Sequence, residues 1–313
     1  MITYALRRLL TGVVLAVLVT FITFLLLSTS FHDMISTLLG PDVTPDAVAR
    51  REHELGYDRP VLVQYGEWLV HAVRGDLGTS LFTTLPVGPS VLSHIVVTMS
   101  IVFPALLIAV IVSVVLGVWA ASRSGAADRV AQGISLVGHV VPALLTAIVL
   151  VVVFAVELKM FPATGYVQFA DNPYGWLRSI TLPVVALVIA GMASMTAQIR
   201  GSMIEELGKD YVRTLRTAGV PTRSIVLKHA LRNAASPALT VMSLEFIQLF
   251  SYSVIIENVF ALPGFGSFAF SSAQTIDVPV IMGVTLVSVI LVVVVNLLAD
   301  IANGYLNPKA RTH

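Results

Sequence analysis

The chain has 313 residues, of which 56% are hydrophobic and 12% charged, and its mean hydropathy is +0.88. These values exclude an ordinary soluble domain and a disordered polar chain, and they place the protein in the membrane class. The chain has no cysteine, which excludes disulfides and thiolate metal sites.

Apolar segments long enough to cross a hydrocarbon layer of about 30 Å as helices recur along the chain. We predict an all-α integral membrane protein with transmembrane helices at residues 9–30, 95–122, 130–156, 179–199, 234–256 and 278–299. Arg7 and Arg8 precede the first segment, as in a signal peptide. Its apolar run is longer than a signal core, however, and no A-x-A site follows, so we expect a retained helix.

Charge is distributed unevenly between the two sides of these predicted spans. If the N-terminus is cytoplasmic, 13 of the 19 Lys and Arg residues lie on the inner side, close to span ends. The last outer loop, residues 257–277, carries no positive charge. The positive-inside rule therefore predicts that both termini are cytoplasmic.

Residues 31–93 form the long outer connection, which we expect to be a small extramembrane element. Pro60 and Gly75 are typical start and stop residues for a helix between them. One face of that helix would carry Val61, Tyr65, Trp68, Leu69 and Ala72. The helix could rest at the headgroups through its Trp and Tyr, or serve as a platform for an external partner.

The inner connection, residues 200–237, is the most informative part of the chain. Placed on a helix, Leu207, Tyr211, Leu215 and Ala218 share one face, while Lys209, Arg213 and Arg216 share the opposite face. Gly219 and Pro221 would end this helix, and a second short helix would occupy residues 222–232.

A lipid-bound basic helix and a plain connector are the alternatives for this segment. Three basic residues are fewer than the four to eight expected of a lipid anchor. A long connection with its own structure is usually functional. We therefore interpret the segment as a lever that docks a moving partner.

Glu245 is the one charged residue placed inside a predicted span, where a carboxylate costs about 2.5 to 3.5 kcal/mol. Gln248, Ser251 and Tyr252 would share its face. This face could line a transport route, or Glu245 could form a hydrogen bond to a partner subunit.

His139 is more simply a packed helix residue than a metal ligand, and Pro104, Pro142 and Pro183 are expected at kinks.

Three groups of motifs resemble the peptide and nickel permease family of ABC importers. Residues 211–214 (YVRT), 218–219 (AG), 228–233 (KHALRN) and Pro237 resemble its coupling loop, the EAA loop. Residues 55–60 (LGYDRP), 64–65 (QY) and 74–80 (RGDLGTS) resemble the outer loop of its B-type subunit. Residues 257–260 (ENVF), 263–266 (PGFG) and 277–280 (DVPV) resemble its last outer loop. Leu215, Ala218 and Glu245 depart from the residues more usual in the family.

The resemblance implies a type I importer permease fold in a bacterial inner membrane, with residues 1–30, 31–93 and 94–313 as its parts. The implied partners are a second permease subunit, two cytoplasmic ATPases that bind ATP and Mg²⁺, and an extracytoplasmic binding protein that delivers peptide; no nucleic acid is expected. The implied ATPase contacts are Leu207, Asp210, Tyr211, Arg213, Thr214, Leu215, Arg216, Ala218 and Gly219. The implied docking residues for the binding protein are Tyr65, Trp68, Asp76, Pro263, Phe265 and Asp277.

No phosphate-binding loop, metal-spaced cluster or G-x-S-x-G nucleophile turn is found, which favours a chain that is not itself an enzyme. The leading interpretation is the permease subunit of an ATP-driven peptide importer without a cofactor of its own. Alternatives are the same architecture with nickel chelates, glutathione or another small solute as cargo, and a proton-coupled secondary transporter that depends on Glu245.

Overall fold

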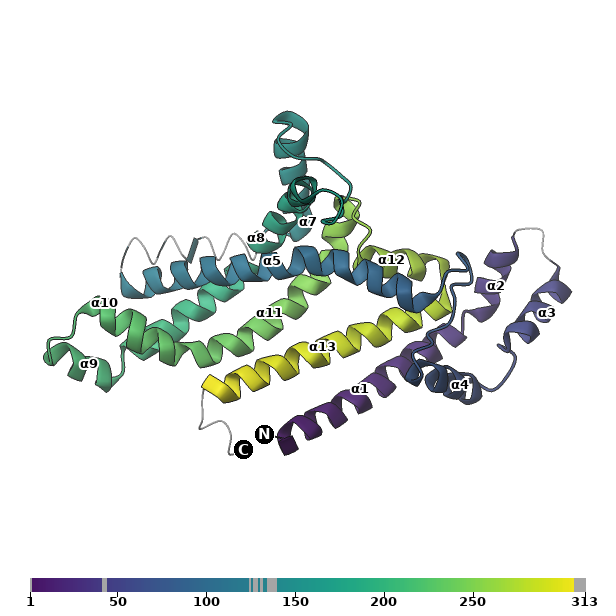
Figure 1. Cartoon of the computed structure of the whole chain (residues 1–313), viewed down its shortest axis with the longest axis horizontal. Helices are drawn as coiled ribbons and strands as arrows, with labels where there is room; N and C mark the ends of the chain where they lie inside the picture. The colour runs from purple at the N-terminus through teal and green to yellow at the C-terminus, as the bar shows by residue number, and fades with distance from the viewer. Residues whose placement is uncertain are drawn as a thin grey trace. The chain divides into compact units, whose positions relative to one another are not determined.

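The computed structural model describes residues 2–40, 44–123, 125, 129, 132–133 and 140–306, with the backbone alone for 2–6, 235–240 and 303–306. Within these residues all regular structure is helical apart from one isolated bridge between Thr79 and Pro86, so the all-α prediction is confirmed. The elements, shown in Figure 1, are α1 (Ile2–Ser28), α2 (Phe31–Leu39), α3 (Pro45–Leu55), α4 (Val61–Val73), α5 (Val87–Ser122), α7 (Ala143–Leu150), η1 (Val151–Glu157), α8 (Pro173–Leu207), α9 (Asp210–Thr217), α10 (Thr222–Ser224), η2 (Ile225–Ala230), α11 (Leu231–Val259), α12 (Phe265–Thr275) and α13 (Val278–Leu306).

Four described helical segments are long and apolar enough to cross a membrane: Arg7–Ser28, Val87–Ser122, Pro173–Leu207 and Val278–Ala302. Ala143–Glu157 is a shorter apolar helix, and α11 contains the predicted fifth span. Helices suit these segments because hydrocarbon offers no partner for backbone groups, which must bond within the segment. Most of residues 130–139, including His139, lies outside the described residues.

The predicted proline kinks have different outcomes. Pro104 and Pro183 lie inside α5 and α8. Pro142 instead precedes α7, where its extended conformation caps a new helix start. Because Val140 is helical and α7 begins at Ala143, the helical path is interrupted at Pro142, in keeping with the prediction; proline lacks the N–H that an interior helical position needs.

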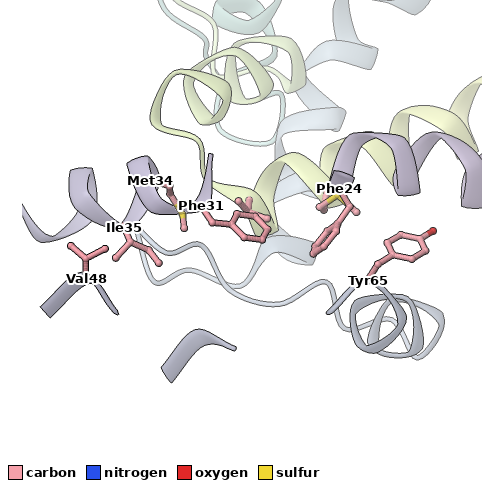
Figure 2. Packing of buried hydrophobic residues seen from close by; sticks show 8 residues of the cluster. Phe24, Phe31, Met34, Ile35, Val48 and Tyr65 are labelled. Carbon is pink, nitrogen blue, oxygen red and sulfur yellow. The ribbon is translucent and has the colours of Figure 1, made fainter. Parts of the chain in front are cut away.

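The chain divides into two compact units, Met1–Val97 with Pro263–Val294, and Thr98–Leu262 with Val295–His313. In the first unit, α1 to α4 and the start of α13 bury a common apolar cluster (Figure 2). Phe24, Phe31 and Tyr65 are among its members. The Phe24 ring lies edge-on to that of Phe31, at a centroid distance of 5.8 Å, and tilted to that of Tyr65, at 5.9 Å. The segment after α1 is therefore packed on the first helix.

Tyr65 is the polar anchor of this cluster. It is only 7% exposed, and its hydroxyl shares a hydrogen bond of 2.9 Å with Thr20 and donates one of 2.9 Å to the carbonyl of Val17. The predicted helix start at Pro60 and the stop beside Gly75, whose φ is 86°, are confirmed. The Tyr65 ring therefore packs inside the protein, and a headgroup position for the helix stays a prediction.

Asp277 ties the loop after α4 to the start of α13. Its carboxylate is buried, accepting a 2.5 Å hydrogen bond from the Ser80 hydroxyl and a 3.3 Å bond from the Leu81 amide. Nearby, burial raises the pKa of Tyr57 to about 12, and the charge of Asp277 adds to this rise. Residues almost 200 positions apart are joined by this contact, which fixes the loop over the helix end.

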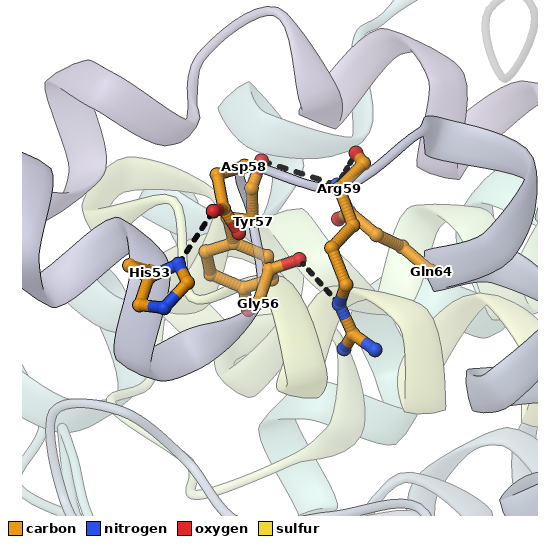
Figure 3. A network of polar contacts seen from close by, with 6 residues as sticks. All are labelled: His53, Gly56, Tyr57, Asp58, Arg59 and Gln64. Atoms are coloured by element: carbon orange, nitrogen blue, oxygen red, sulfur yellow. Dashed lines mark hydrogen bonds and ion pairs between the residues drawn. The ribbon is translucent and has the colours of Figure 1, made fainter.

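A small polar network closes the end of α3 (Figure 3). The Arg59 side chain donates to the Gly56 carbonyl at 3.3 Å, and His53 Nδ1 lies 2.6 Å from Asp58 Oδ2. The hydrogen bond and charge of Asp58 raise the pKa of His53 above its usual 6.5. In turn the hydrogen bond to His53 lowers the pKa of Asp58 below its usual 3.8.

These two shifts predict a window of pH in which the His53 and Asp58 pair stabilises the fold. The contribution of His53 to the free energy of unfolding is complete below pH 6.5 and is lost as pH rises through its raised pKa. That of Asp58 is complete above pH 3.8 and is lost as pH falls through its lowered pKa. The unfolding midpoint of His53→Gln in detergent should therefore fall furthest below that of the wild type between these values. In an Asp58→Asn background, the same substitution should show no such window.

In the second unit, α8 and α11 pack along each other and against α7, while α5 lies against α8. Gly117 permits the close approach of α5, because a Cβ there would lie 2.8 Å from Ile199 Cγ2 and 3.1 Å from the Arg200 amide nitrogen. The buried Ser113 hydroxyl also donates to the Met192 carbonyl at 3.1 Å. Near the start of this unit, the Thr98 hydroxyl donates to the fully buried Glu257 carboxylate at 2.5 Å.

The approach of α5 to α8 predicts that Gly117→Ala lowers stability by about 1 to 3 kcal/mol, the usual cost of overpacking. Gly201→Ala in α8 is the matched control, because nothing lies within 4 Å of a Cβ at that position. This control should keep or raise stability, by up to about 1 kcal/mol, since alanine is the better helix former. Thermal unfolding in detergent tests both variants, and equal midpoints would contradict the close approach.

Candidate functional site

The candidate coupling helix is α9, Asp210–Thr217, and it is shorter than the sequence predicts. Helix α8 continues to Leu207, and the amide of Gly208 closes its last turn on the carbonyls of Ile204 and Glu205. Lys209 is then extended, with φ −72° and ψ 153°, and α9 begins anew. The single helix predicted from Leu207 to Ala218 is therefore wrong.

This break changes which side chains of α9 face the protein. Because Lys209 resets the helical phase, Leu207 belongs to α8 and packs with the apolar cluster at its end. Val212 is the fully buried residue of α9, Tyr211 and Leu215 are partly buried, and Ala218 is exposed. The predicted face of Leu207, Tyr211, Leu215 and Ala218 is thus replaced by one centred on Val212.

Gly219 ends α9 as predicted. Its φ is 76°, the left-handed conformation that glycine adopts without strain. The Gly219 amide donates to the Arg216 carbonyl at 3.1 Å, and the Val220 amide donates to the Leu215 carbonyl at 3.0 Å. Together these bonds form a Schellman turn, which satisfies the last carbonyls of the helix and fixes its end.

Glu206 fastens the start of α9 to the end of α8. Its side chain is 12% exposed and accepts hydrogen bonds from the Lys209 ammonium and, at 3.0 Å, from the Tyr211 hydroxyl. The hydrogen bond to Glu206 raises the pKa of Lys209. The pKa of Tyr211 is raised mainly by burial of its phenol. Asn233 in α11 donates to the same hydroxyl at 3.3 Å, so Tyr211 bridges α8 and α11.

An apolar cluster supports the region where these helices meet. Ile199 and Met203 of α8 pack with Val226 and Ala230 of η2 and Ala234 of α11, all buried. The predicted helix start at Thr222 is confirmed, and α10, η2 and α11 follow one another without a break into the fifth predicted span. The η2 turns are wider than α-helical turns, a local form often seen at functional sites.

The outer surface of α9 is left exposed. The side chains of Asp210 and Arg213 are 97% and 79% exposed and lie 3.7 Å apart, and Thr214, Arg216, Ala218 and Gly219 are exposed as well. A partner could therefore contact these six residues directly. Tyr211 and Leu215 could contribute only their uncovered parts, and ATPase contact stays a prediction for the whole set.

Glu245 is buried, unlike the three polar residues expected to share its face. It is 2% exposed, and its Oε1 would lie 2.8 Å from a Cβ at Gly191 of α8. Within the described residues this oxygen has no hydrogen-bond partner. Gln248, Ser251 and Tyr252 are exposed on α11 instead. A pathway role stays a prediction, but these four side chains do not form one exposed polar face in this chain.

The residues predicted to dock a binding protein differ in accessibility. Asp76 and Pro263 are exposed, whereas Tyr65, Phe265 and Asp277 are buried and Trp68 is partly buried. The buried members can shape the outer surface but cannot themselves contact a partner in this conformation. Docking remains a prediction, centred on the exposed members.

Sequence reasoning missed Glu206, Val212, Asn233 and Gly191. The signal for Glu206 was available, because an acidic residue three positions before Lys209 can pair with it across one helical turn. Asn233 and Gly191 carry no such local signal, since their partners lie on other helices.

Comparison with known proteins shows the family of this chain. Residues 113–312 match the model of the binding-protein-dependent transport system inner membrane component, and residues 1–102 match the N-terminal model of the same kind of protein. A putative peptide transport system permease protein of Brucella abortus (strain 2308) is 36% identical over 98% of both chains. The oligopeptide transport system permease protein AppB of Bacillus subtilis (strain 168) is 31% identical, also over 98% of both.

A chain from the inward-facing structures of the MetNI methionine ABC transporter has a similar fold. The TM-score is 0.56 at 15% identity, and the match covers 69% of this chain and 96% of that one. At this identity the similarity concerns the fold alone.

The Tyr211 bridge predicts that Tyr211→Phe loosens α9. Removing the hydroxyl should cost about 1 kcal/mol and leave Glu206 and Asn233 without one partner each. Hydrogen exchange in α9 should accelerate, with α8 amides before Glu206 less affected. Thr217→Ala is the control, because that exposed hydroxyl bonds within α9, to the Thr214 carbonyl. Equal protection of α9 in wild type and Tyr211→Phe would contradict the bridge.

Proposed function

Since the chain belongs to the family of binding-protein-dependent transport system inner membrane components, we propose that it is the permease subunit of an ATP-driven importer of short peptides. The names of the relatives from Brucella abortus and Bacillus subtilis support a peptide cargo. The chain is a multi-pass membrane protein of a bacterial inner membrane. We further propose six spans with both termini in the cytoplasm, in keeping with the positive-inside distribution.

The observation that carries the coupling role is the attachment of α9. It is exposed on one side and held on the other by Glu206 of α8 and Asn233 of α11 through Tyr211. Helices α8 and α11 also pack along each other. A push on α9 would therefore move two membrane helices together and would not bend a loose loop.

The proposed cycle uses this attachment as a two-state element. Two cytoplasmic ATPases bind ATP and Mg²⁺, and one of them holds the exposed surface of α9. Their closure shifts the permease pair between inward-open and outward-open states, and each ligand biases that equilibrium only by its differential affinity for the two states. A second permease subunit completes the pathway, and an extracytoplasmic binding protein delivers peptide from the outer side. The chain itself does no hydrolysis.

Charge reversal on α9 tests this function. In the co-expressed and reconstituted complex, peptide-loaded binding protein should stimulate ATP hydrolysis. Arg213→Glu with Arg216→Glu should reduce that stimulation by about tenfold or more, because both exposed side chains would face the ATPase with the wrong charge. Arg123→Glu is the matched control, since Arg123 is exposed directly after α5 and lies outside the inner connection of residues 200–237.

Two outcomes would contradict the proposal. Unchanged stimulation of the double variant at equal assembly would mean that α9 is not the coupling surface. Solute uptake by this chain alone, driven by a proton gradient without any ATPase, would instead favour a secondary transporter. Stimulation by a nickel chelate or glutathione, but not by peptides, would keep the architecture and change the cargo.

A further inference from the structure

A pocket of about 420 Å³ opens in the first unit, between α2, α3 and the loop after α4. The lining residues from α3, at positions 47, 50, 51 and 54, have the i, i+3, i+4 and i+7 spacing of one helical face. Val48, which α3 buries in the apolar cluster, lies on another face. The lining combines aliphatic side chains, among them Leu39, Ala47 and Leu81, with the charged side chains of Arg50, Arg51 and Glu54.

The charged side chains give the pocket a net positive charge. Arg51 forms an ion pair of 2.7 Å with Glu54, so these two charges balance each other. Arg50 is exposed, and its Nε donates to the Asp46 carbonyl of the same helix at 3.4 Å. Among the residues that the structure describes, no carboxylate forms an ion pair with Arg50. A guanidinium has five N–H donors, so the terminal nitrogens of Arg50 can pair with an acid from another molecule.

This positive charge is opposite to that of the surrounding segment. Residues 31–93 contain eight Asp and Glu residues against four Arg and no Lys, and two of the four arginines line the pocket. Complementary charge across an interface guides the encounter and selects the partner. An approaching carboxylate is therefore attracted to the pocket and repelled by the acidic residues elsewhere in the segment.

One wall of the pocket is tied to a membrane helix. The Leu81 amide donates to Asp277 Oδ1 at 3.3 Å, and the Ser80 hydroxyl donates to Asp277 Oδ2 at 2.5 Å. Asp277 directly precedes α13, and its carbonyl accepts from the Ile281 amide at 2.9 Å in the first turn of that helix. Leu81 also packs on the buried cluster that includes Met282 of α13. A side chain that presses on Leu81 would therefore act on the start of α13.

The proposed function requires a soluble partner on the side of the membrane where its topology places this segment. The residues that contribute most to binding in such interfaces are side chains seated in pockets, and arginine is common among them. We propose that the pocket docks the binding protein by receiving one aliphatic side chain that is adjacent to an Asp or Glu. The aliphatic group contacts Leu39, Ala47 and Leu81, and the carboxylate pairs with Arg50. This inference rests on the proposed function and adds a second docking surface to the one around Asp76.

A free short peptide fits this pocket less well than a folded partner does. An exposed ion pair contributes little by itself, because water and salt screen it. A folded partner adds contacts around the rim that exclude water from the central pair. The observations therefore favour a protein, and the test below distinguishes it from free peptide.

Titration of the reconstituted importer in nanodiscs tests the pocket. The peptide-loaded binding protein that stimulates the wild-type complex is titrated while ATP hydrolysis is measured. Arg50→Glu should raise its half-maximal concentration about tenfold and leave basal hydrolysis and maximal stimulation unchanged. Ala47→Phe, which fills the pocket, should raise the half-maximal concentration similarly. The shift for Arg50→Glu should shrink in high salt, since screening weakens exposed charge pairs.

Arg74→Glu is the matched control, because Arg74 is exposed in the same segment and does not line the pocket. It changes the net charge equally, and its half-maximal concentration should stay close to that of the wild type.

Ser80→Ala tests the connection to α13. It should lower maximal stimulation about threefold, the effect of losing one hydrogen bond, and keep the half-maximal concentration. An unchanged maximum would overturn this connection.

A photoreactive benzophenone at position 39 identifies the occupant, because Leu39 is 41% exposed. The crosslink should reach an aliphatic residue beside an Asp or Glu of the binding protein. Crosslinks to lipid or to the second permease subunit would overturn the proposal, as would loss of the crosslink when free peptide alone is added. Wild-type titration curves for both Arg50→Glu and Ala47→Phe would remove this docking site and leave the proposed function standing. A wild-type complex that no binding protein stimulates would overturn both.

Discussion

The structure depends on one constraint, that polar groups removed from water must find partners inside the protein. For the backbone this constraint produces long helices. For side chains it produces a few buried hydrogen bonds between elements far apart in the sequence. Thr20 with Tyr65 joins α1 to α4, and Ser80 with Asp277 joins the loop after α4 to α13. These bonds are directional, so they fix which surfaces of the apolar helices meet.

The same constraint explains how a short helix can act on long ones. Glu206 is mostly covered, and it is satisfied by the ammonium of Lys209 and the phenol of Tyr211. Because Asn233 of α11 bonds to that phenol, α9 is attached to both helices that border it. The Schellman turn at Gly219 satisfies the opposite end of α9 without any partner on another element. The exposed side of α9 therefore remains available while its inner side is fixed.

The segment after α1 also has a different role from a simple outer loop. Helices α2, α3 and α4 contribute Phe31, Val48 and Tyr65 to the same cluster as Phe24 of α1. Through Leu69, Ala72 and Val73 of α4 this segment also lines an apolar groove beside α1 and α13. Packing of the first helix and the shape of the outer surface are therefore linked, because both involve α4.

The sequence by itself determined the class of the protein, most of its long helices and the family. Apolar runs of sufficient length and turn residues such as Gly219 act locally, so they can be recognised without knowing what lies beside them. The motifs around Tyr211 and Gly219 likewise carried the resemblance that the comparisons confirmed.

Only the tertiary structure decided which residues the polar side chains lie beside. A helical wheel drawn from Leu207 failed because one extended residue, Lys209, changed the phase of everything after it. Glu245 was placed beside Gln248 by spacing, but its position depends on Gly191 of α8, a residue without a side chain to signal the contact. Tyr65 is buried because Thr20 and Val17 offer it partners from α1. Such contacts join residues distant in the chain, and their geometry exists only after the helices have packed.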